Sequence, residues 1–302
     1  MLPWVEMVEK ATNGRVKIEI YDAQTLTKAM DVWEATKSGV ADMAYAFHGY
    51  WPNMTPLADV ISLPFMPFKS AEQASGILWQ LYEKYPVFRN QFKDNHVLLF
   101  WTTTPYFLVN AKREVKTMED LKGMKIRVIG GPPVDSMKRL GGVPITMNMP
   151  DTYMNIQKGV IDGMGAVWEA LYSYKQYEVA KYYTFVPLYT GYFSQVMNNN
   201  TWNSLPKDVQ EQITNATAGL KGSTFWGRSM FDSANKEVPP VVRSKGYPMV
   251  EYTLPANELA KWSEVAGKPL WDEWVKKMES SGYPQAREIL EATLNLINTY
   301  TP

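Results

Sequence analysis

A strand, a helix and a second strand follow one another within the first fifty residues of this chain. Residues 15–21 alternate apolar and charged side chains, which is the period of a half-buried strand. Residues 26–38 have the pattern of a helix that ends at Gly39, and residues 41–47 form a run of small and apolar residues typical of a buried strand. This order favours a parallel sheet with crossover helices, so we predict an α/β fold.

Strands and helices continue to alternate toward the C-terminus. Ser70 and Gln73 have the spacing of a helix start, and that helix ends before Pro86. Residues 207–237 have one long helical pattern, either a single helix spanning more than one domain or two helices with a break at 219–222. Further predicted strands or extended runs are residues 96–102, 106–110, 192–198 and 249–253, and further predicted helices are residues 3–10, 152–158, 256–266, 269–280 and 284–299.

Composition excludes several function classes. The 302 residues suffice for two domains, and 31 basic side chains balance 31 acidic ones, so no basic field favours nucleic acid. Cysteine is absent and only His48 and His96 are present, which removes thiol nucleophiles and cysteine-based zinc sites. No HExxH, phosphate-loop or GxSxG pattern occurs. We therefore expect no enzyme activity, no cofactor and no metal.

Arg127 is the strongest candidate for binding a ligand. It lies on a predicted strand, residues 125–129, which ends at Gly130-Gly131 before a helix that starts near Pro132. An arginine at such a strand end lies beside a crevice, where its guanidinium can hold a carboxylate through two parallel hydrogen bonds. The alternative is a surface arginine on an edge strand.

The motifs around Arg127 resemble one family. They resemble, in order and spacing, the DctP-type solute-binding proteins of tripartite ATP-independent periplasmic (TRAP) transporters, over nearly the whole chain. The segments that carry this resemblance are Thr12-Asn13-Gly14-Arg15-Val16, Gly39-Val40-Ala41-Asp42-Met43, Leu63-Pro64-Phe65, Gly123-Met124-Lys125-Ile126-Arg127-Val128, Leu140-Gly141-Gly142-Val143-Pro144, Gln157-Lys158-Gly159-Val160-Ile161-Asp162-Gly163 and Leu205-Pro206-Lys207-Asp208-Val209-Gln210.

The resemblance implies a two-lobed periplasmic-binding-protein fold that closes over its ligand about a hinge. Lobe I would comprise residues 1–104 and 193–235, and lobe II residues 105–192 and 236–285, with a C-terminal helix, residues 286–302, packed back on the lobes. The chain would cross between lobes at residues 103–110 and 192–198. The resemblance further implies a periplasmic location and delivery of the ligand to TRAP membrane permease subunits. Some relatives form dimers, but we expect a monomer. Family members begin with a signal peptide and a first strand that this sequence lacks, so the chain looks shortened at its N-terminus.

In the family, the arginine at the position of Arg127 pairs with the ligand carboxylate. Sialic-acid-binding relatives have further polar anchors at positions that correspond to Tyr106, Phe47 and the stretch around Trp168. The apolar and aromatic residues found here predict a less polar carboxylate than a sugar acid, because buried hydroxyl groups of the ligand would stay unpaired. Trp168 could instead pack beneath the Asp162-Gly163 turn.

Other candidate ligand-binding residues surround this set. His48 and Trp51 follow the strand 41–47, at the sheet edge where loops line crevices in open α/β sheets, although a lone histidine is more often a structural residue. Phe193 and Gln195 lie on the second crossing and are expected to alternate in direction, so that one of them faces the cleft. Three roles stay open for Glu169: solvated, paired with Arg127, or bound to a ligand amine.

These observations predict an extracytoplasmic protein that binds an organic acid, with an aromatic or branched apolar monocarboxylate favoured over a small hydroxy- or keto-acid. Arg127 would hold the carboxylate, and Phe47, Trp168, Tyr106 and Phe193 would form the walls. A ligand-presenting receptor for a sensor kinase would have the same fold. An enzyme with an aromatic cleft is a further alternative, but no pair of catalytic groups supports it.

Overall fold

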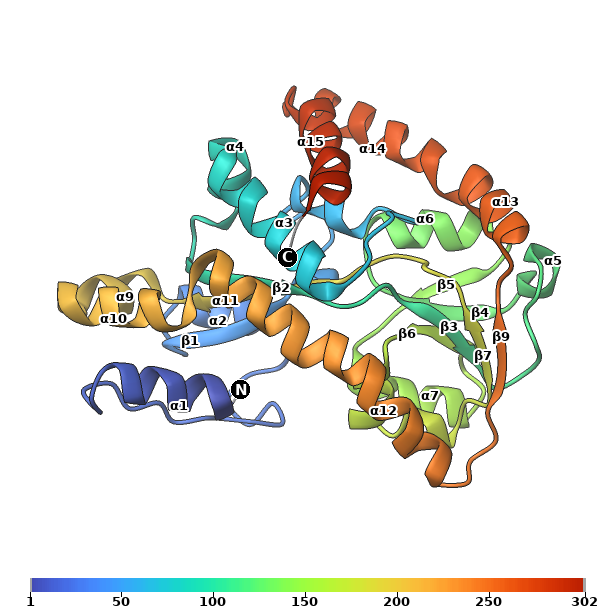
Figure 1. The fold of residues 1–302 in the computed structure, drawn as a ribbon, viewed down its shortest axis with the longest axis horizontal. Helices are drawn as coiled ribbons and strands as arrows, with labels where there is room; N and C mark the ends of the chain where they lie inside the picture. The colour runs from blue at the N-terminus through green and yellow to red at the C-terminus, as the bar shows by residue number, and fades with distance from the viewer. Residues whose placement is uncertain (1, 301–302) are drawn as a thin grey trace.

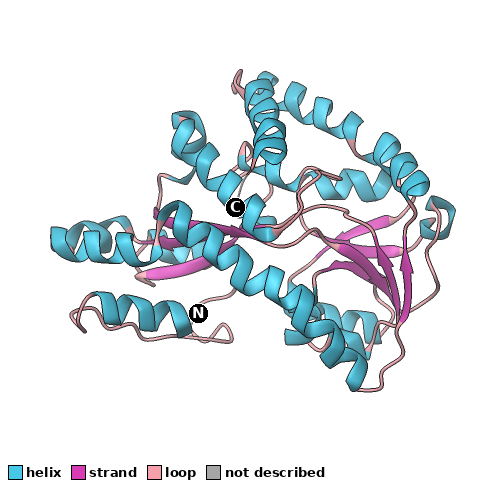
Figure 2. Cartoon of the chain, viewed as in Figure 1, coloured by secondary structure: helices cyan, strands magenta, loops and turns pink. Residues whose placement is uncertain are grey.

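The computed structural model describes residues 2–300 and contains two β-sheets, each covered by helices (Figures 1 and 2). The smaller sheet has the order β1-β8-β2 and the larger one the order β5-β4-β6-β3-β7-β9. The strands are β1 (Met43–Phe47), β2 (His96–Thr102), β3 (Phe107–Asn110), β4 (Lys125–Val128), β5 (Val143–Thr146), β6 (Gly163–Ala166), β7 (Tyr182–Phe185), β8 (Tyr192–Met197) and β9 (Val250–Thr253). We call the part built on the smaller sheet lobe I and the part built on the larger sheet lobe II. The division by residue number given above stays a prediction, and its residues 1, 301 and 302 lie outside the described chain.

The predicted parallel sheet is only partly confirmed. In lobe I both β1 and β2 pair antiparallel with β8, which lies between them. In lobe II, β4 is parallel to β5 and β6, and β7 is parallel to β9, whereas β3 is antiparallel to β6 and β7. The difference arises where the chain returns between lobes, because β3 and β8 enter their sheets from the other lobe.

The strand predicted at residues 15–21 is wrong. These residues belong to no strand in the described chain, and Ile20 and Tyr21 are exposed. Alternation of apolar and charged residues gives a strand only where a neighbour completes the ladder of hydrogen bonds, and β1 pairs with β8 alone. The helix predicted at 26–38 is likewise shorter, α2 (Val32–Lys37).

Helix ends follow local chemistry more closely. Helix α3 (Ala71–Lys84) begins at Ser70, whose hydroxyl accepts the Gln73 N–H at 3.0 Å, and the helix ends before Pro86 as predicted. The Gln73 amide oxygen in turn accepts the Lys69 N–H at 2.8 Å. The other helices are α1 (Leu2–Ala11), α4 (Pro86–Arg89), α5 (Met118–Leu121), α6 (Pro132–Arg139), α7 (Thr152–Gln157), α8 (Trp168–Ser173), α9 (Asn199–Ser204), α10 (Lys207–Thr217), α11 (Gly219–Trp226), α12 (Ser233–Ser244), α13 (Ala256–Ala266), α14 (Lys268–Ser280) and α15 (Ala286–Thr299).

The long helical pattern predicted at residues 207–237 is broken once. The break lies between α10 and α11, where Gly219 has a φ of +73°, a backbone angle that favours glycine. From there α11, a π-helical segment at residues 227–232 and α12 form one path that crosses from lobe I to lobe II (Figure 1). The helix does not end near residue 237, as predicted, but continues through Pro239 and Pro240 to Ser244.

Three segments between β2 and β9 therefore connect the lobes. The first crossing, residues 103–106, lies between β2 and β3 as predicted, but the second lies at residues 186–191, because residues 192–197 already form β8 of lobe I. The two crossings pair through their backbones, since the Tyr106 N–H donates to the Tyr189 carbonyl at 2.7 Å and the Leu188 N–H donates to the Tyr106 carbonyl at 2.9 Å. The C-terminal helix α15 packs on α3, where the Gln73 amide donates to the Ile297 carbonyl.

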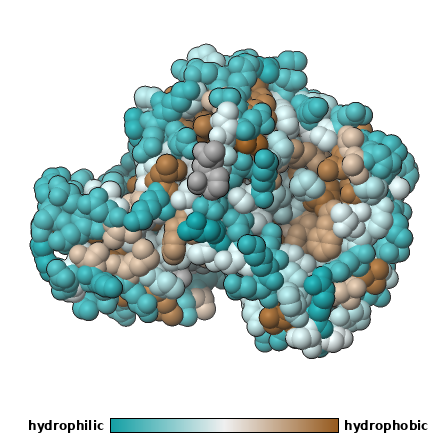
Figure 3. Space-filling model, in the orientation of Figure 1, coloured by the Kyte–Doolittle hydropathy of each residue, from teal (hydrophilic) through white to brown (hydrophobic). Residues whose placement is uncertain are grey.

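Apolar side chains fill the space inside both lobes. In Figure 3 the outer faces of the helices are mostly hydrophilic, and hydrophobic side chains gather in a hollow on the right, where Figure 1 places the six-stranded sheet. No helix among residues 2–300 has the length and apolar character that a membrane crossing needs.

Candidate functional site

Arg127 lies on β4 of the lobe II sheet, between the edge strand β5 and β6. Its side chain is only 1% exposed. Nε and Nη2 both donate to the Met147 carbonyl at 3.2 Å, which fixes the plane of the guanidinium. Nη1 is buried and has no hydrogen-bond partner within the described chain. A buried cationic donor without a partner is costly unless an anion satisfies it, so the arrangement fits a bound carboxylate.

Two tyrosines from the paired crossings lie beside Arg127. The rings of Tyr106 and Tyr189 stack with centroids 4.6 Å apart, and both side chains are buried. Burial raises the pKa of each phenol above its usual range, and the positive charge of Arg127 opposes that rise in both pKa values. The tyrosines therefore stay protonated, as donors next to the guanidinium. Tyr106 was predicted from the sequence, whereas Tyr189 was missed.

Aromatic side chains of lobe I form a cluster that faces lobe II. Phe193 packs on Phe47 at 4.7 Å and on Trp101 at 5.2 Å between ring centroids. Phe47 reaches lobe II, because a Cβ built on Gly49 would lie 2.7 Å from its ring and 3.0 Å from Ile129 Cβ. It also lies near Tyr106, since a Cβ at Gly191 would meet both rings within 3.3 Å. Phe47, Phe193 and Tyr106 thus come together as predicted walls.

The two lobes touch directly beside this cluster. The Gly130 N–H of lobe II donates to the Gly49 carbonyl of lobe I at 3.0 Å. The Met149 N–H of lobe II donates to the Tyr50 hydroxyl at 3.2 Å. These contacts lie close to Arg127 and to its partner Met147, so the two lobes meet at the buried guanidinium, and we call this meeting zone the cleft.

Glu169 does not pair with Arg127. Its carboxylate accepts the Ser173 hydroxyl at 2.9 Å, and the ion pairs of the described chain join Arg127 to no acid. Burial raises the pKa of Glu169, and the Ser173 hydrogen bond opposes the rise. The Glu169 charge in turn raises the pKa values of Tyr45, Tyr106 and Tyr174, which places it near the cleft. Of its three roles, pairing with Arg127 is therefore excluded.

His48 is buried inside lobe I, and Trp51 is a partly buried residue of the same lobe. Nε2 of His48 is 2.8 Å from Ser194 Oγ and Nδ1 is 3.3 Å from Thr55 Oγ1. Burial lowers the His48 pKa to about 3, so the ring is neutral. Trp51 packs near His48, and its indole N–H donates to the Met30 carbonyl at 2.7 Å. These paired groups favour structural roles for both residues.

Trp168 and Gln195 occupy less direct positions. Trp168 packs among Phe107, Tyr183 and Phe185 inside lobe II, which favours the packing alternative. Gln195 is buried on β8, and its Oε1 has no partner among the described residues. The expectation that Phe193 and Gln195 face opposite ways is wrong, because residues two apart on a strand share one face. On β1, Phe193 pairs with Phe47 and Gln195 pairs with Tyr45, so the pairing residues are also two apart.

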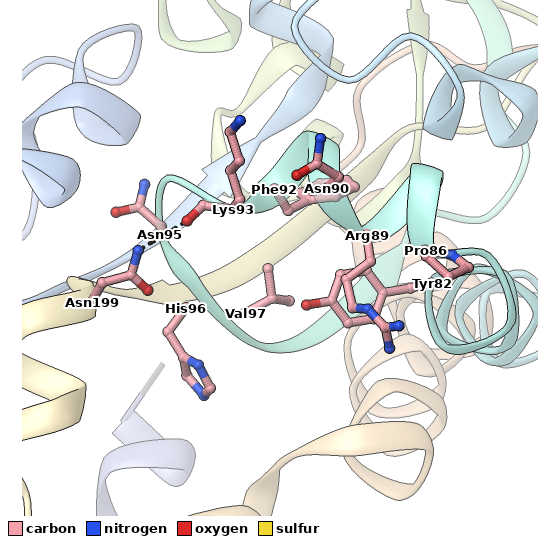
Figure 4. Close-up of a pocket in the computed structure, with 10 residues that line it drawn as sticks. All are labelled: Tyr82, Pro86, Arg89, Asn90, Phe92, Lys93, Asn95, His96, Val97 and Asn199. Atoms are coloured by element: carbon pink, nitrogen blue, oxygen red, sulfur yellow. Dashed lines mark hydrogen bonds between the residues drawn. The ribbon is translucent and has the colours of Figure 1, made fainter. Parts of the chain in front are cut away.

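Two surface hollows lie elsewhere and contain none of the predicted ligand-binding residues. The first is formed by α3, α4, β2 and α9, and in it the side chains of Arg89 and Lys93 point in different directions (Figure 4). Its Asn199 amide already donates to the Lys93 carbonyl at 2.9 Å. No cluster of three potential metal ligands occurs among residues 2–300. The cleft at Arg127 is therefore the candidate site.

Comparison with known proteins agrees with this geometry. The model of the DctP family, described as bacterial extracellular solute-binding protein, family 7, matches residues 1–277. The C4-dicarboxylate-binding periplasmic protein DctP of Rhodobacter capsulatus is 27% identical over 276 residues, 90% of this chain and 80% of that protein.

Two solved structures superpose on nearly the whole chain. A marine metagenome TRAP solute-binding protein specific for aromatic acid ligands, in complex with 3-hydroxybenzoate, is 30% identical with a TM-score of 0.92, covering 100% of this chain and 93% of that one. A TRAP solute-binding protein from Rhodoferax ferrireducens, in complex with copurified benzoate, is 27% identical with a TM-score of 0.92, covering 98% and 91%.

The family fixes the general role of the two-lobed fold. Its members are periplasmic transport proteins rather than enzymes, and they bind small carboxylates and work with membrane permease components. The cleft with a buried arginine has the form that such a role needs. This chain belongs to the DctP family of bacterial extracellular solute-binding proteins and is a TRAP-type binding protein for organic acids.

Proposed function

We propose that this protein captures a monocarboxylate with an aromatic or branched apolar body and delivers it to a TRAP permease. The observation that carries the proposal is the buried, unpartnered Nη1 of Arg127 inside a cleft walled by Phe47, Phe193 and Tyr106. The guanidinium would hold the carboxylate, and the rings would bury the apolar body. Because the ligand would contact both lobes only in the closed state, it would favour closure.

A single carboxylate fits the charges of the cleft better than two. Arg127 is the one cationic group that influences the pKa values of both Tyr106 and Tyr189, and the other charge near Tyr106 is the acid Glu169. A second ligand carboxylate would therefore lie without a cationic partner and close to a like charge. Burial of an unpaired charge costs several kcal/mol, roughly enough to select against dicarboxylates.

The apolar walls oppose sugar acids for a related reason. Each ligand hydroxyl buried against rings without a partner costs about 1–3 kcal/mol. Two relatives of 30% and 27% identity, whose structures contain 3-hydroxybenzoate and benzoate, support an aromatic ligand.

The test is a thermal-shift and calorimetric screen of the purified protein with benzoate, isovalerate, lactate, succinate and glucuronate. A ligand that binds only the native state raises the melting temperature by mass action. We expect benzoate or isovalerate to give the largest shift. Arg127→Ala should reduce that affinity by about 100-fold or more, because it removes charge-assisted hydrogen bonds of ~1.5–3 kcal/mol each.

Two further variants make the result specific. Arg127→Lys keeps the charge but loses the planar fork of donors, so we expect partial loss of binding. Arg139→Ala removes an arginine that pairs with Glu273 on the surface, and it should leave binding unchanged. Stronger binding of succinate or glucuronate, or equal binding by Arg127→Ala, would overturn the proposal.

A further inference from the structure

A second buried donor without a partner lies beside Arg127. The Tyr189 hydroxyl is buried and has no hydrogen-bond partner within the described chain. The charge of Arg127 acts on its pKa, and so does the Ile129 N–H, which points toward the phenol oxygen. An amide that approaches the oxygen leaves the phenol proton free to donate elsewhere. Two donors, the Tyr189 hydroxyl and Arg127 Nη1, are thus left unsatisfied in one region.

The fold makes room for this hydroxyl in particular. A Cβ built on Gly165 of β6 would lie 2.2 Å from Tyr189 Oη and 3.0 Å from Cζ, so any larger residue would push the phenol away. On its other side the ring stacks on Tyr106 with 26° between planes. The phenol is therefore held from two sides, with its hydroxyl against β6 at the residue that follows Met164, the register partner of Arg127. Buried polar groups are usually paired, and a fixed one without a partner calls for an explanation.

We propose that the Tyr189 hydroxyl donates to one oxygen of the ligand carboxylate while Arg127 Nη1 donates to that group as well. This inference rests on the proposed function, because it assumes that Arg127 binds a carboxylate. A carboxylate has two oxygens and accepts several hydrogen bonds, so one carboxylate can accept from both the Tyr189 hydroxyl and Arg127 Nη1. A primary amide would turn its NH₂ toward one of the two donors. The pair therefore selects a carboxylate over its uncharged amide.

This pairing also ties the ligand to the hinge. Tyr189 lies on the second crossing, and its carbonyl accepts the N–H of Tyr106 on the first crossing. A carboxylate bound to Tyr189 would contact the crossing segment as well as the lobe II sheet that carries Arg127. Tyr189 is thus assigned as a ligand-binding residue that the motif around Arg127 does not contain.

The test compares Tyr189→Phe with wild type, using benzoate and benzamide as probes in isothermal titration calorimetry. The variant removes one oxygen and keeps the ring stack. We expect benzoate affinity to fall about tenfold, as for loss of one hydrogen bond to a charged group. Tyr183→Phe is the matched control, since that tyrosine is buried in lobe II and donates to the Ala180 carbonyl, away from the cleft. It should change benzoate affinity less than twofold.

Two further measurements separate ligand contact from a structural role. The melting temperature of ligand-free Tyr189→Phe should stay close to that of wild type, because the hydroxyl proton has no acceptor to lose and only the approach of the Ile129 N–H to the phenol oxygen is removed. In a crystal structure with benzoate, Tyr189 Oη should lie roughly 2.5–2.7 Å from a carboxylate oxygen.

The outcomes distinguish this inference from the proposed function. If Arg127→Ala abolishes benzoate binding but Tyr189→Phe leaves it within twofold, the role of Tyr189 is wrong and the proposed function stands. If wild type binds neither benzoate nor any other monocarboxylate of the screen, both are wrong. A lower melting temperature of ligand-free Tyr189→Phe, with unchanged benzoate affinity, would show a structural tyrosine.

Discussion

Two buried polar clusters, one in each lobe, differ in whether their hydrogen bonds are complete. In lobe I both ring nitrogens of His48 have partners, Ser194 and Thr55. In lobe II, Arg127 Nη1 and the Tyr189 hydroxyl have none within the described chain. Both clusters contain the residue types that sequence reasoning associates with ligand sites. Pairing, rather than residue type, separates the structural cluster from the one with room for a ligand.

The lobe I cluster extends through a chain of partners. Thr55 Oγ1 is 2.9 Å from the Tyr192 hydroxyl, which also donates to Asp59 Oδ1 at 3.1 Å. The Tyr192 ring stacks on His48 with centroids 4.9 Å apart. This network joins the end of β1, strand β8 and the 3₁₀ helix at residues 58–62. Its role is therefore to stabilise the packing of lobe I. The comparison therefore predicts that substitutions here change stability, whereas substitutions beside Arg127 change binding.

The largest expected effect comes from breaking the complete cluster. His48→Leu removes both hydrogen bonds and leaves the buried Ser194 hydroxyl without its partner. We expect a loss of about 3 kcal/mol in the free energy of unfolding, measured by urea titration, because each buried orphan costs ~1–3 kcal/mol. Benzoate affinity of the folded fraction should stay within twofold of wild type.

A conservative change provides the control for this first prediction. His48→Gln can restore one hydrogen bond and should lose less stability than His48→Leu. A large drop in benzoate affinity for either variant, without a drop in stability, would contradict the structural role of His48 and would show that it contacts the ligand.

The next largest effect tests the incomplete cluster. Gly165→Ala would place its Cβ 2.2 Å from Tyr189 Oη, so the phenol has to move and its stack on Tyr106 is disturbed. We expect roughly 1–3 kcal/mol of lost stability, as for other overpacking changes, together with weaker benzoate binding in calorimetry. Gly246→Ala, at an exposed glycine with a φ of +76° and no atom within 4 Å of the added Cβ, shows the cost of backbone strain without a steric clash and without a change in benzoate affinity. Unchanged benzoate affinity in Gly165→Ala would show that the position of Tyr189 does not matter to the ligand.

Much of the fold could be predicted from local sequence. The helix start at Ser70 and helix α13 follow from capping and period, which are short-range signals. The antiparallel insertion of β8 between β1 and β2 could not be predicted, because pairing partners far apart in the chain leave no local trace. For the same reason the segment at residues 15–21 was taken for a strand, although alternation alone does not supply a neighbour.

The site shows the same limit. Arg127 could be predicted because a strand, a glycine turn and a helix lie next to it in sequence. Tyr189 could not be predicted, because Arg127 is far from it in the sequence. In addition, the second crossing was predicted at residues 192–198, whereas it lies at residues 186–191. The one available signal was Gly191 with Pro187, a short turn-rich stretch between two strands. His48 was a candidate ligand-binding residue because the sequence does not show that Ser194 and Thr55 will lie beside its ring.

A smaller effect concerns Asp59, at the end of the lobe I network. Burial raises its pKa to about 7, and the Tyr192 hydrogen bond and the Lys277 charge oppose the rise. The folded state therefore keeps the proton that the unfolded state has lost between about pH 4 and pH 7. The stability that Asp59 contributes is complete below the unfolded pKa and is lost as the pH rises through the folded pKa.

Asp59→Asn tests this pH dependence. The amide oxygen can still accept the Tyr192 hydroxyl, and the group is neutral at every pH. The variant should be more stable than wild type by on the order of 1–2 kcal/mol at pH 8 and equal to it at pH 4, in urea titrations at both values. Parallel pH profiles for the two proteins would show that Asp59 titrates normally in the folded state.

The smallest expected effect sharpens the comparison inside the cleft itself. Glu169 is the acid near Tyr106, and it would repel a bound carboxylate across the cleft. Glu169→Gln should strengthen benzoate binding, within about fivefold at low salt, because charges separated by several ångströms near a protein surface interact by ~1 kcal/mol or less. The gain should shrink as the pH falls toward the raised pKa of Glu169, because more of the group is then protonated and uncharged. Glu264→Gln, on an exposed part of α13, should leave benzoate binding unchanged over the same pH range. Weaker rather than stronger binding of the natural ligand by Glu169→Gln would mean that Glu169 accepts a hydrogen bond or an ammonium group from it, and the apolar body proposed for the ligand would then need a polar substituent on that side.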